Sequence, residues 1–166
     1  MLIRVRSIPE EGLDVSFSIP AAQVRAGFPK GDDAADIFER DVSCSVHLDL
    51  NRKDVFLTGG AGTSIRPVCS RCGESFDSPL EIDLSLTCSP GRPAPGADPY
   101  QESDEGLIFY NHEQLDLSEI VREQLLLALP IQYLCKPDCR GLCAGCGVNL
   151  NAESGEHTCP KKAARH

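Results

Sequence analysis

Strict alternation of apolar and polar residues is the feature of this sequence that most constrains its fold. It runs without interruption through residues 42–50 and again through residues 80–88. Residues 54–68 continue it, with three glycines (59, 60 and 62) that indicate a bulge or bend, and with four apolar residues in phase: Val55, Leu57, Ala61 and Ile65. A period of two is that of a half-buried β-strand. Three such strands with short connections predict an antiparallel meander with one buried face.

One amphipathic helix is expected to cover that sheet. Asp116 with Glu119 three residues later matches a capping box at a helix N-terminus, and Pro130 is expected to stop the helix. Residues 2–6 and 13–19 can add one or two further strands. The predicted fold class is therefore α+β: an antiparallel β meander packed by one main helix, with a C-terminal zinc-knuckle segment. The expected apolar face of the helix consists of Leu117, Ile120, Val121, Gln124, Leu125 and Ala128.

Composition suggests where the chain divides. Its 166 residues, 41% of them hydrophobic, suffice for one domain with a real core and a small appendage. We expect an α+β domain over residues 1–134 and a zinc-binding, cysteine-rich tail over residues 135–166. Within the first, residues 90–106 are rich in proline, glycine and acidic groups, which is typical of a solvated loop.

The tail contains the strongest chemical signal, a run of closely spaced cysteines. Cys135, Cys139, Cys143 and Cys146 are followed by Cys159, and a glycine follows Cys146. A Cys-x-x-Cys-Gly turn can point two thiolates at one ion, and zinc takes four ligands in a tetrahedron. The N-terminal residues lack a secretory signal, so we expect a cytoplasmic protein, in which clustered cysteines more often bind metal than form disulfides. The odd count of nine cysteines also disfavours complete disulfide pairing.

Two ligand sets are compatible with these spacings. In the first, four of the five tail cysteines (135, 139, 143, 146 and 159) hold one structural Zn²⁺, with His157 as a further candidate. In the second, Cys69 and Cys72 share the ion with Cys143 and Cys146. The local set is favoured because it closes a shorter loop at a lower entropic cost. A thioredoxin-type use of Cys143 and Cys146 is disfavoured, since residues 145–151 have no helical pattern.

The remaining residues suggest no catalytic centre. Cys44 and Cys88 fall on the apolar phase of their strands and are expected to be small buried hydrophobes. We find no phosphate-binding glycine loop, nucleophile elbow or paired carboxylates. No apolar run approaches the roughly 18 residues of a membrane span. The sequence therefore predicts a protein that is not an enzyme and does not span a membrane.

The net charge and its distribution limit the classes of partner that we expect. The net charge is −9, but residues 135–166 carry five basic and three acidic residues, a net +2, so the rest carries −11. Binding to a phosphate backbone relies on Lys and Arg, so broad nucleic-acid affinity is not expected. A contact with rRNA would fall in the tail, where the excess of positive charge is small.

The order of motifs resembles one known family. A strand meander contains Val68-Cys-Ser-Arg-Cys72, and an acidic loop leads to a helix that ends in Leu-Ala-Leu-Pro130. The chain then reads Cys139-Arg-Gly-Leu-Cys-Ala-Gly-Cys146-Gly, followed by Val-Asn-Leu-Asn151. Over roughly residues 40–160 this resembles the YceD family, the large ribosomal RNA subunit accumulation proteins of bacteria and plastids. The family also leads us to expect a further cysteine near Cys159, where this chain continues with Pro-Lys-Lys.

The resemblance implies a function in ribosome biogenesis. It leads us to expect a non-enzymatic factor in the accumulation of large-subunit (23S) rRNA, which binds a ribosomal protein or a large-subunit assembly factor. An acidic protein suits a basic partner through complementary potentials. Two other classes fit the cysteines: a general zinc-ribbon adapter with no ribosomal link, and a thiol redox protein or redox-sensing chaperone.

Overall fold

A computed structural model describes residues 1–28, 35–91, 106–152 and 157–160. The elements in chain order are β1 (Leu2–Arg4), the 3₁₀ turn η1 (Val5–Ser7), β2 (Leu13–Ile19), α1 (Ala21–Arg25), β3 (Val42–Asn51), β4 (Asp54–Ile65), β5 (Ser78–Pro90), β6 (Leu107–Tyr110), β7 (Gln114–Asp116) and α2 (Leu117–Leu127). The chain forms two compact units. Residues 1–64 and 79–129 form the first, which we call the sheet unit; residues 65–78 and 130–166 belong to the second, the cysteine unit. This division differs from the expected boundary at residue 134, because residues 65–78 group with the C-terminal segment.

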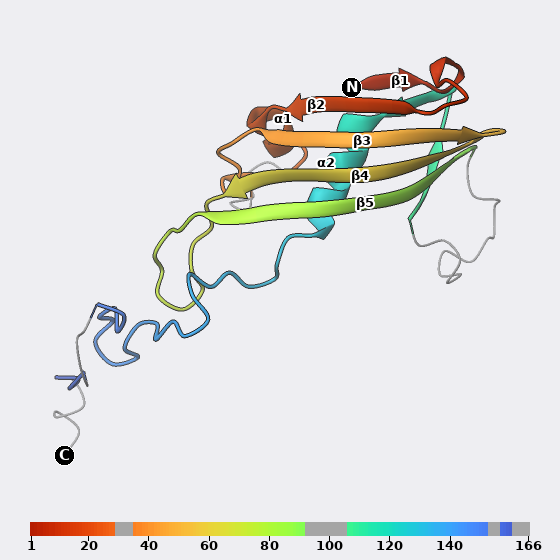
Figure 1. The fold of residues 1–166 in the computed structure, drawn as a ribbon. Coiled ribbons are helices and arrows are strands. Elements are labelled where there is room, and N and C mark those ends of the chain that lie inside the picture. Colours follow the sequence, from red (N-terminus) through yellow and green to blue (C-terminus); the bar gives the residue numbers. More distant parts are fainter. Residues whose placement is uncertain (29–34, 92–105, 153–156, 161–166) are drawn as a thin grey trace. The chain divides into compact units, whose positions relative to one another are not determined.

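The sheet unit is built on the expected meander. Its five-stranded sheet has the order β2-β3-β4-β5-β6, and Figure 1 shows β2 to β5 side by side. β3 pairs antiparallel with both β2 and β4, whereas the short β6 pairs parallel with β5. β1 and β7 form a separate antiparallel pair. The predicted α+β class, an antiparallel meander with one main helix, is confirmed.

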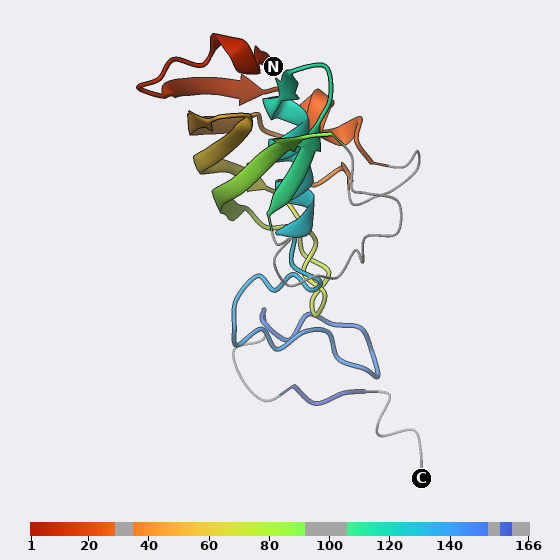
Figure 2. The same cartoon turned by 90° about the vertical axis from the view of Figure 1, so that its right-hand side faces the viewer.

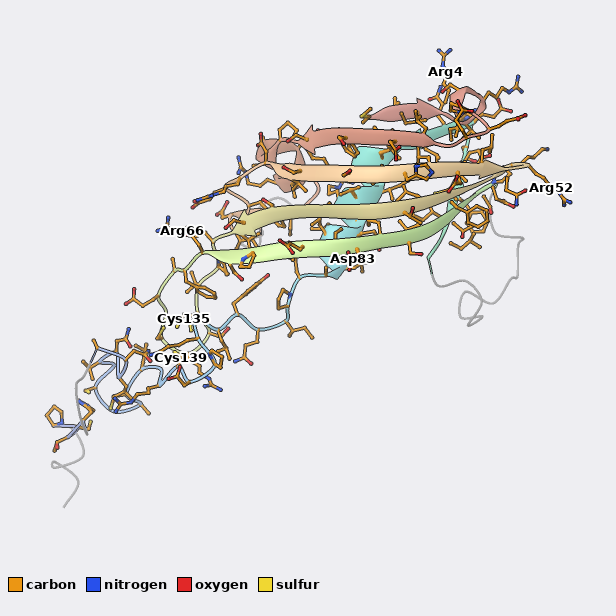
Figure 3. All side chains as sticks on the ribbon, viewed as in Figure 1. Arg4, Arg52, Arg66, Asp83, Cys135 and Cys139 are labelled. Carbon is orange, nitrogen blue, oxygen red and sulfur yellow. The ribbon has the colours of Figure 1, made fainter. Side chains whose placement is uncertain are left out.

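The core lies between one face of the sheet and α2, which crosses the strands on one side (Figures 1 and 2). Alternate residues of β3 and β4 supply it, and each apolar residue named from the pattern of β4 is at most 6% exposed. The opposite face carries polar side chains, such as that of Asp83 on β5 (Figure 3). The two-residue period therefore separates a buried and a solvated face as predicted.

The glycines of β4 do not form a bulge towards β3, contrary to the expectation. The pairing between the two strands runs without interruption from Asp54 to Gly62. Gly59 has a φ of 140° and lies so close to β3 that a Cβ would overlap the carbonyl oxygen of Ser45. Glycine is therefore needed for close approach of two backbones rather than for an extra residue.

The helix begins where the capping pattern predicts. The carboxylate of Asp116 accepts hydrogen bonds from the N–H groups of Ser118 (3.0 Å) and Glu119 (3.3 Å). Four residues of the predicted apolar face are buried, while Gln124 is partly exposed and Ala128 is exposed at the C-cap. α2 ends at Leu127, a little before Pro130, because the residue preceding a proline is disfavoured in the helical region.

Among the described helices, none is both long and apolar enough to cross a membrane. The acidic loop expected over residues 90–106 falls mostly on residues 92–105, which lie outside the described part of the chain.

Candidate metal centres

Residues 68–75 form a tight hairpin that we call the first knuckle. The N–H of Cys69 donates to the carbonyl oxygen of Glu74 (2.9 Å), and the N–H of Gly73 donates to that of Cys69 (2.9 Å). Val68 and Ser75 close the hairpin as an antiparallel bridge. Gly73 has a φ of 74°, a conformation that glycine adopts at little cost.

Residues 142–149 form a second knuckle with the same hydrogen bonds. The N–H of Cys143 donates to the carbonyl oxygen of Val148 (2.9 Å), and the N–H of Gly147 donates to that of Cys143 (2.8 Å). Leu142 and Asn149 form the closing bridge, and Gly147 has a φ of 78°. Both hydrogen bonds and the closing bridge of the first knuckle thus recur 74 positions later. The second Cys-x-x-Cys lies in this turn and not at the start of a helix, unlike a thioredoxin-type motif.

Each knuckle brings its two thiols to a second pair of donors. The first cluster consists of Cys69, Cys72, Cys135 and Cys139, whose four sulfur atoms all lie within 4.8 Å of one another. Figure 3 labels the last two, which follow α2 in the chain. The Sγ atoms of Cys69 and Cys139 are 3.8 Å apart, and those of Cys72 and Cys135 are 3.7 Å apart. A tetrahedral zinc ion with Zn–S bonds of about 2.3 Å places its sulfurs roughly 3.8 Å apart, whereas a disulfide needs about 2.05 Å. The spacing fits a metal site.

The first cluster is largely buried, with only Cys135 partly exposed, and neighbouring residues hold its ligands in place. Three of its four cysteines are at most 4% exposed, and Phe76 and Leu134 pack against them. The side-chain amide of Asn151 donates to the Sγ of Cys139 (3.3 Å). The guanidinium of Arg71 donates to the carbonyl oxygen of the same cysteine (3.1 Å). Such outer contacts hold ligands in the orientation that a metal requires.

The second cluster has a different donor set and is more open. It consists of Cys143, Cys146, His157 and Cys159, all partly exposed, with their donor atoms within 4.8 Å of one another. The Nε2 atom of His157 lies 3.2 Å from the Sγ of Cys146. Gly145 leaves room for Cys159, since a Cβ there would come within 2.5 Å of its sulfur. The cluster borders a hollow of about 630 Å³ that three of the four donor residues help to line.

In each knuckle the electrostatics favour the thiolate, the form that binds metal, at the first cysteine, whereas the pKa of the second cysteine, Cys72 or Cys146, is raised. The backbone N–H groups of Cys135, Cys72 and Arg71 stabilise the Cys69 thiolate and lower the pKa of that thiol to about 6. Those of Cys146 and Gly145 lower the pKa of Cys143 to about 6 in the same way. Burial and the neighbouring cysteines raise the pKa of Cys135 to about 12, since one cluster of thiols does not readily hold four negative charges without a cation.

The structure groups the cysteines differently from both arrangements expected from the sequence. Cys135 and Cys139 lie with Cys69 and Cys72, and not with the other tail cysteines. Cys143 and Cys146 lie with Cys159 and with His157, which was only a further candidate ligand in the sequence analysis. Joining Cys72 to Cys135 costs less loop entropy than expected, because most of the intervening residues fold into the sheet unit and are not free chain. The sequence signal that could have identified His157 and Cys159 as a pair of ligands is their His-x-Cys spacing near the C-terminus.

Cys44 and Cys88 take no part in either cluster. They are 4% and 0% exposed in the core of the sheet unit, as the strand pattern predicts. Burial raises the pKa of both thiols to about 11, so they stay protonated at neutral pH. Within the described residues, the structure therefore offers two Cys/His clusters that can bind a metal ion.

Comparison with known proteins adds a family to this geometry. The sequence profile described as "Large ribosomal RNA subunit accumulation protein YceD" matches residues 57–165, a range that contains both clusters. An uncharacterized protein of Mycobacterium tuberculosis is 34% identical over 114 residues, which is 65% of this chain and 54% of that protein. No solved structure matches the chain significantly.

Two plant relatives carry a descriptive name. Chloroplastic proteins named large ribosomal RNA subunit accumulation protein YCED homolog 1 are 38% identical in Zea mays, over 68% of this chain and 47% of the relative, and 28% identical in Arabidopsis thaliana, over 66% and 41%. The chain thus spans about half the length of the curated relatives that it matches.

Proposed function

Because the chain belongs to the YceD family of large ribosomal RNA subunit accumulation proteins, we propose that it is a non-enzymatic factor that supports accumulation of 23S rRNA and ribosome biogenesis. It does so by binding a ribosomal protein or a large-subunit assembly factor. The observation that carries this proposal is the family match over more than half of the chain, across both knuckles. The names of the plant relatives agree with it.

A basic protein partner is favoured by the charge of the chain. With a net charge of −9, the protein repels a bare phosphate backbone and attracts the cationic proteins that coat rRNA. The basic residues Lys161, Lys162 and Arg165, which could contact rRNA, lie outside the described residues. Direct rRNA contact is therefore secondary in this proposal.

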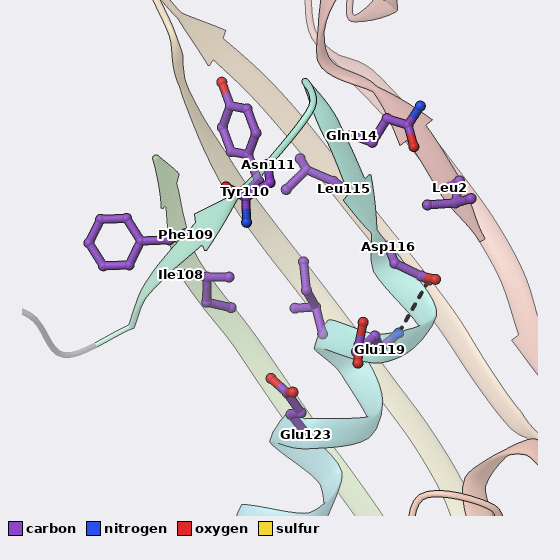
Figure 4. A pocket seen from close by; sticks show the side chains of 11 residues that line it. Leu2, Ile108, Phe109, Tyr110, Asn111, Gln114, Leu115, Asp116, Glu119 and Glu123 are labelled. Carbon is purple, nitrogen blue, oxygen red and sulfur yellow. Dashed lines mark hydrogen bonds between the residues drawn. The ribbon is translucent and has the colours of Figure 1, made fainter. Parts of the chain in front are cut away.

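An acidic groove on the sheet unit is a suitable place for such a partner. Figure 4 shows it between β6, β7 and the first turns of α2, and its volume is about 350 Å³. Apolar side chains and carboxylates line it together, and none of the lining residues is Lys or Arg. The apolar residues include Leu2, Ile108 and Ile120, and the carboxylates are those of Asp116, Glu119 and Glu123. Asp116 already caps the helix and Glu119 lies 3.5 Å from Arg122, so the exposed Glu123 has the most freedom to meet a cation.

The metal in the cysteine unit is proposed to be structural zinc. Thiolate and imidazole donors in sets of four, with no position left for water or substrate, are typical of structural zinc sites. The unit has little else to stabilise it, since its buried hydrophobic cluster consists of three cysteines. Zinc would therefore hold the unit together without taking part in a reaction.

The test is affinity purification of the full chain together with rRNA analysis of cells depleted of it. We expect enrichment of a basic ribosomal protein or large-subunit assembly factor, and a lower ratio of 23S to 16S rRNA on depletion. Glu119→Gln with Glu123→Gln should weaken capture of the partner about fivefold. The matched pair Glu81→Gln with Asp83→Asn, on β5 outside the groove, should leave capture unchanged. An unchanged rRNA ratio on depletion, with no ribosomal partner enriched, would refute the proposal.

The same experiments separate the two competing classes. A zinc-ribbon adapter without a ribosomal link would capture other proteins and leave the rRNA ratio unchanged. A redox-sensing chaperone would suppress aggregation of a client protein only after peroxide treatment, and a thiol reductase would reduce insulin disulfides. We expect neither activity.

A further inference from the structure

We propose that the cysteine unit binds two zinc ions in separate sites, and that the ion in the second site exchanges much faster than the ion in the first. The first site consists of Cys69, Cys72, Cys135 and Cys139. The second consists of Cys143, Cys146, His157 and Cys159. Both the number of ions and the inequality between them go beyond the function proposed above, and neither depends on a ribosomal partner.

The number of ions follows from the repeated knuckle. A Cys-x-x-Cys turn supplies two ligands and its closing glycine turns the chain away, so each knuckle needs two donors from elsewhere. The chain supplies two pairs, one to each knuckle: the Cys-x₃-Cys pair at 135 and 139, and the His-x-Cys pair at 157 and 159. The eight donor atoms form two sets of four, which complete the tetrahedral coordination of two zinc ions and leave no donor unused. A single shared site would leave four of these donors unused.

The second donor set also accounts for the sequence after Cys159. Three thiols and one imidazole complete a tetrahedron, so a further cysteine in the Pro-Lys-Lys segment is not required. The Nε2 atom of His157 already faces the Sγ of Cys146 at 3.2 Å. The imidazole therefore takes the fourth position in this chain.

The difference in exchange rate between the two ions follows from the burial of their ligands and from the contacts that hold those ligands in place. In the first site, three of the four cysteines are at most 4% exposed, and Asn151 and Arg71 hold Cys139 through its sulfur and its carbonyl oxygen. In the second site, all four donors are partly exposed, and Cys143, His157 and Cys159 border the hollow of about 630 Å³. A chelator removes zinc through a mixed complex, which requires access to the ion. The second site offers more of that access than the first, in which only Cys135 is partly exposed.

The donor pairs differ in their attachment as well. Cys135 and Cys139 come between α2 and the second knuckle, so the chain is anchored on both sides of them. His157 and Cys159 come after the last isolated bridge of the described chain. Anchoring on both sides restrains Cys135 and Cys139 in the first site, which also favours slower exchange there.

The test is zinc stoichiometry and release in the full chain, purified without chelator and measured by mass spectrometry of the elements. We expect two zinc ions per chain. Excess of the chromophoric chelator 4-(2-pyridylazo)resorcinol should release them in two phases of equal amplitude, with rates at least tenfold apart. His157→Ala should bind one ion and lose the fast phase. Cys72→Ser should lose the slow phase, and Cys44→Ala, the buried control outside both clusters, should keep two ions and both phases.

Cobalt substitution gives a second readout that does not depend on release rates. Thiolate-to-cobalt charge transfer grows with the number of sulfur ligands, so the signal of wild type should be the sum of those of His157→Ala and Cys72→Ser. One ion per chain in wild type would overturn the proposal, as would loss of both ions in His157→Ala. Two ions released in a single phase would overturn the inequality. These results are independent of whether a ribosomal partner is captured.

Discussion

The sheet unit and the cysteine unit obtain their stability from different sources. The sheet unit buries an apolar face of β2 to β5 under α2, and its largest fully buried side chains are those of Phe38, Ile19, Leu48, Leu57 and Leu115. Among its described residues, the cysteine unit buries few side chains besides Ile65, Pro67, Cys69, Cys72 and Cys139, and it contains two bridged hairpins. Hydrophobic burial of a few small side chains does not offset the backbone entropy of such a unit. From this comparison we expect that the sheet unit folds by its core, whereas the cysteine unit depends on a bound metal.

Removal of the metal should show the difference between the two units most clearly, because only the cysteine unit is expected to unfold. Structural zinc contributes about 10–16 kcal/mol of binding free energy in small zinc domains at neutral pH, and this is folding free energy. We therefore expect a strong chelator to abolish hydrogen-exchange protection in residues 68–75 and 142–149 and to leave the protection of β3 to β5 in place. Added zinc should restore the lost protection. Persistent protection of both knuckles after complete demetallation would contradict the comparison.

Truncation of a core side chain should destabilise the sheet unit and leave the cysteine unit unchanged. Leu125 on α2 is 0% exposed, so Leu125→Ala is expected to cost about 3 kcal/mol in the free energy of unfolding of the sheet unit. Leu127 on the same helix is 79% exposed, and Leu127→Ala should cost less than about 0.5 kcal/mol. Urea denaturation followed through the sheet unit measures both. The zinc content of folded Leu125→Ala should equal that of wild type, and a loss of zinc would show that the units are not energetically separate.

A smaller effect is expected from the outer contacts of the first cluster. Asn151 donates to Cys139 and also to the side-chain oxygen of Asn149 (2.9 Å). Asn151→Ala should weaken zinc binding at the first cluster about tenfold, since outer hydrogen bonds to ligands typically contribute 10–100-fold. Competition with a chelator of known affinity provides the measurement. Asn51→Ala, at the exposed end of β3, is the matched control, and equal affinity in the two variants would exclude a function for Asn151 in holding the metal.

The smallest predicted effect concerns the start of α2 and its pH dependence. Burial raises the pKa of Asp116, but hydrogen bonds from the N-terminal amino group and from the N–H groups of Glu119 and Ser118 outweigh it and lower the pKa below 3.8. Loss of the cap in Asp116→Ala should cost about 1 kcal/mol at neutral pH. Because the folded-state pKa is depressed, this stability is present above pH 3.8 and is lost as the pH falls through the folded-state value.

Thermal unfolding of wild type and Asp116→Ala at several pH values tests that window. The difference between the two proteins should be constant from pH 7 to about pH 5 and should shrink below pH 3.8. Asp83→Ala, on the polar face of β5, should match wild type throughout. A difference that persists unchanged to pH 2 would mean that the Asp116 carboxylate does not act as a charged cap.

The contrast between the units also explains what could be predicted from the sequence. The sheet unit follows local rules: the period of two identified Val55, Leu57, Ala61 and Ile65 as core residues, and the capping pattern located the start of α2. The parallel pairing of β6 with β5 was not predicted, because it joins segments on either side of residues 92–105 and has no local pattern. Glycines in β4 were interpreted as a bulge since sequence cannot distinguish a bulge from close backbone approach.

In the cysteine unit, the chemistry was visible but the grouping was not. The residue types and the Cys-x-x-Cys spacings identified every cysteine of the two clusters as a candidate ligand. Which pair joins which knuckle depends on where the chain returns after 50 or more residues of other structure, and spacing alone contains no such information. The same limit applies to His157, because a single histidine can be recognised as a ligand only from the sulfur atom that lies beside it in the structure.

The first cluster has a consequence for the order of events during synthesis. Cys72 and Cys135 are 63 residues apart, and most of the sheet unit's second segment lies between them. At 5–20 residues per second, the ribosome needs roughly 3 to 13 seconds to add the missing ligands after the first pair has been made. The sheet unit therefore has its entire sequence before either metal site is complete. Any metal ion held by all four donors of a cluster therefore binds after the whole sheet unit has been synthesised.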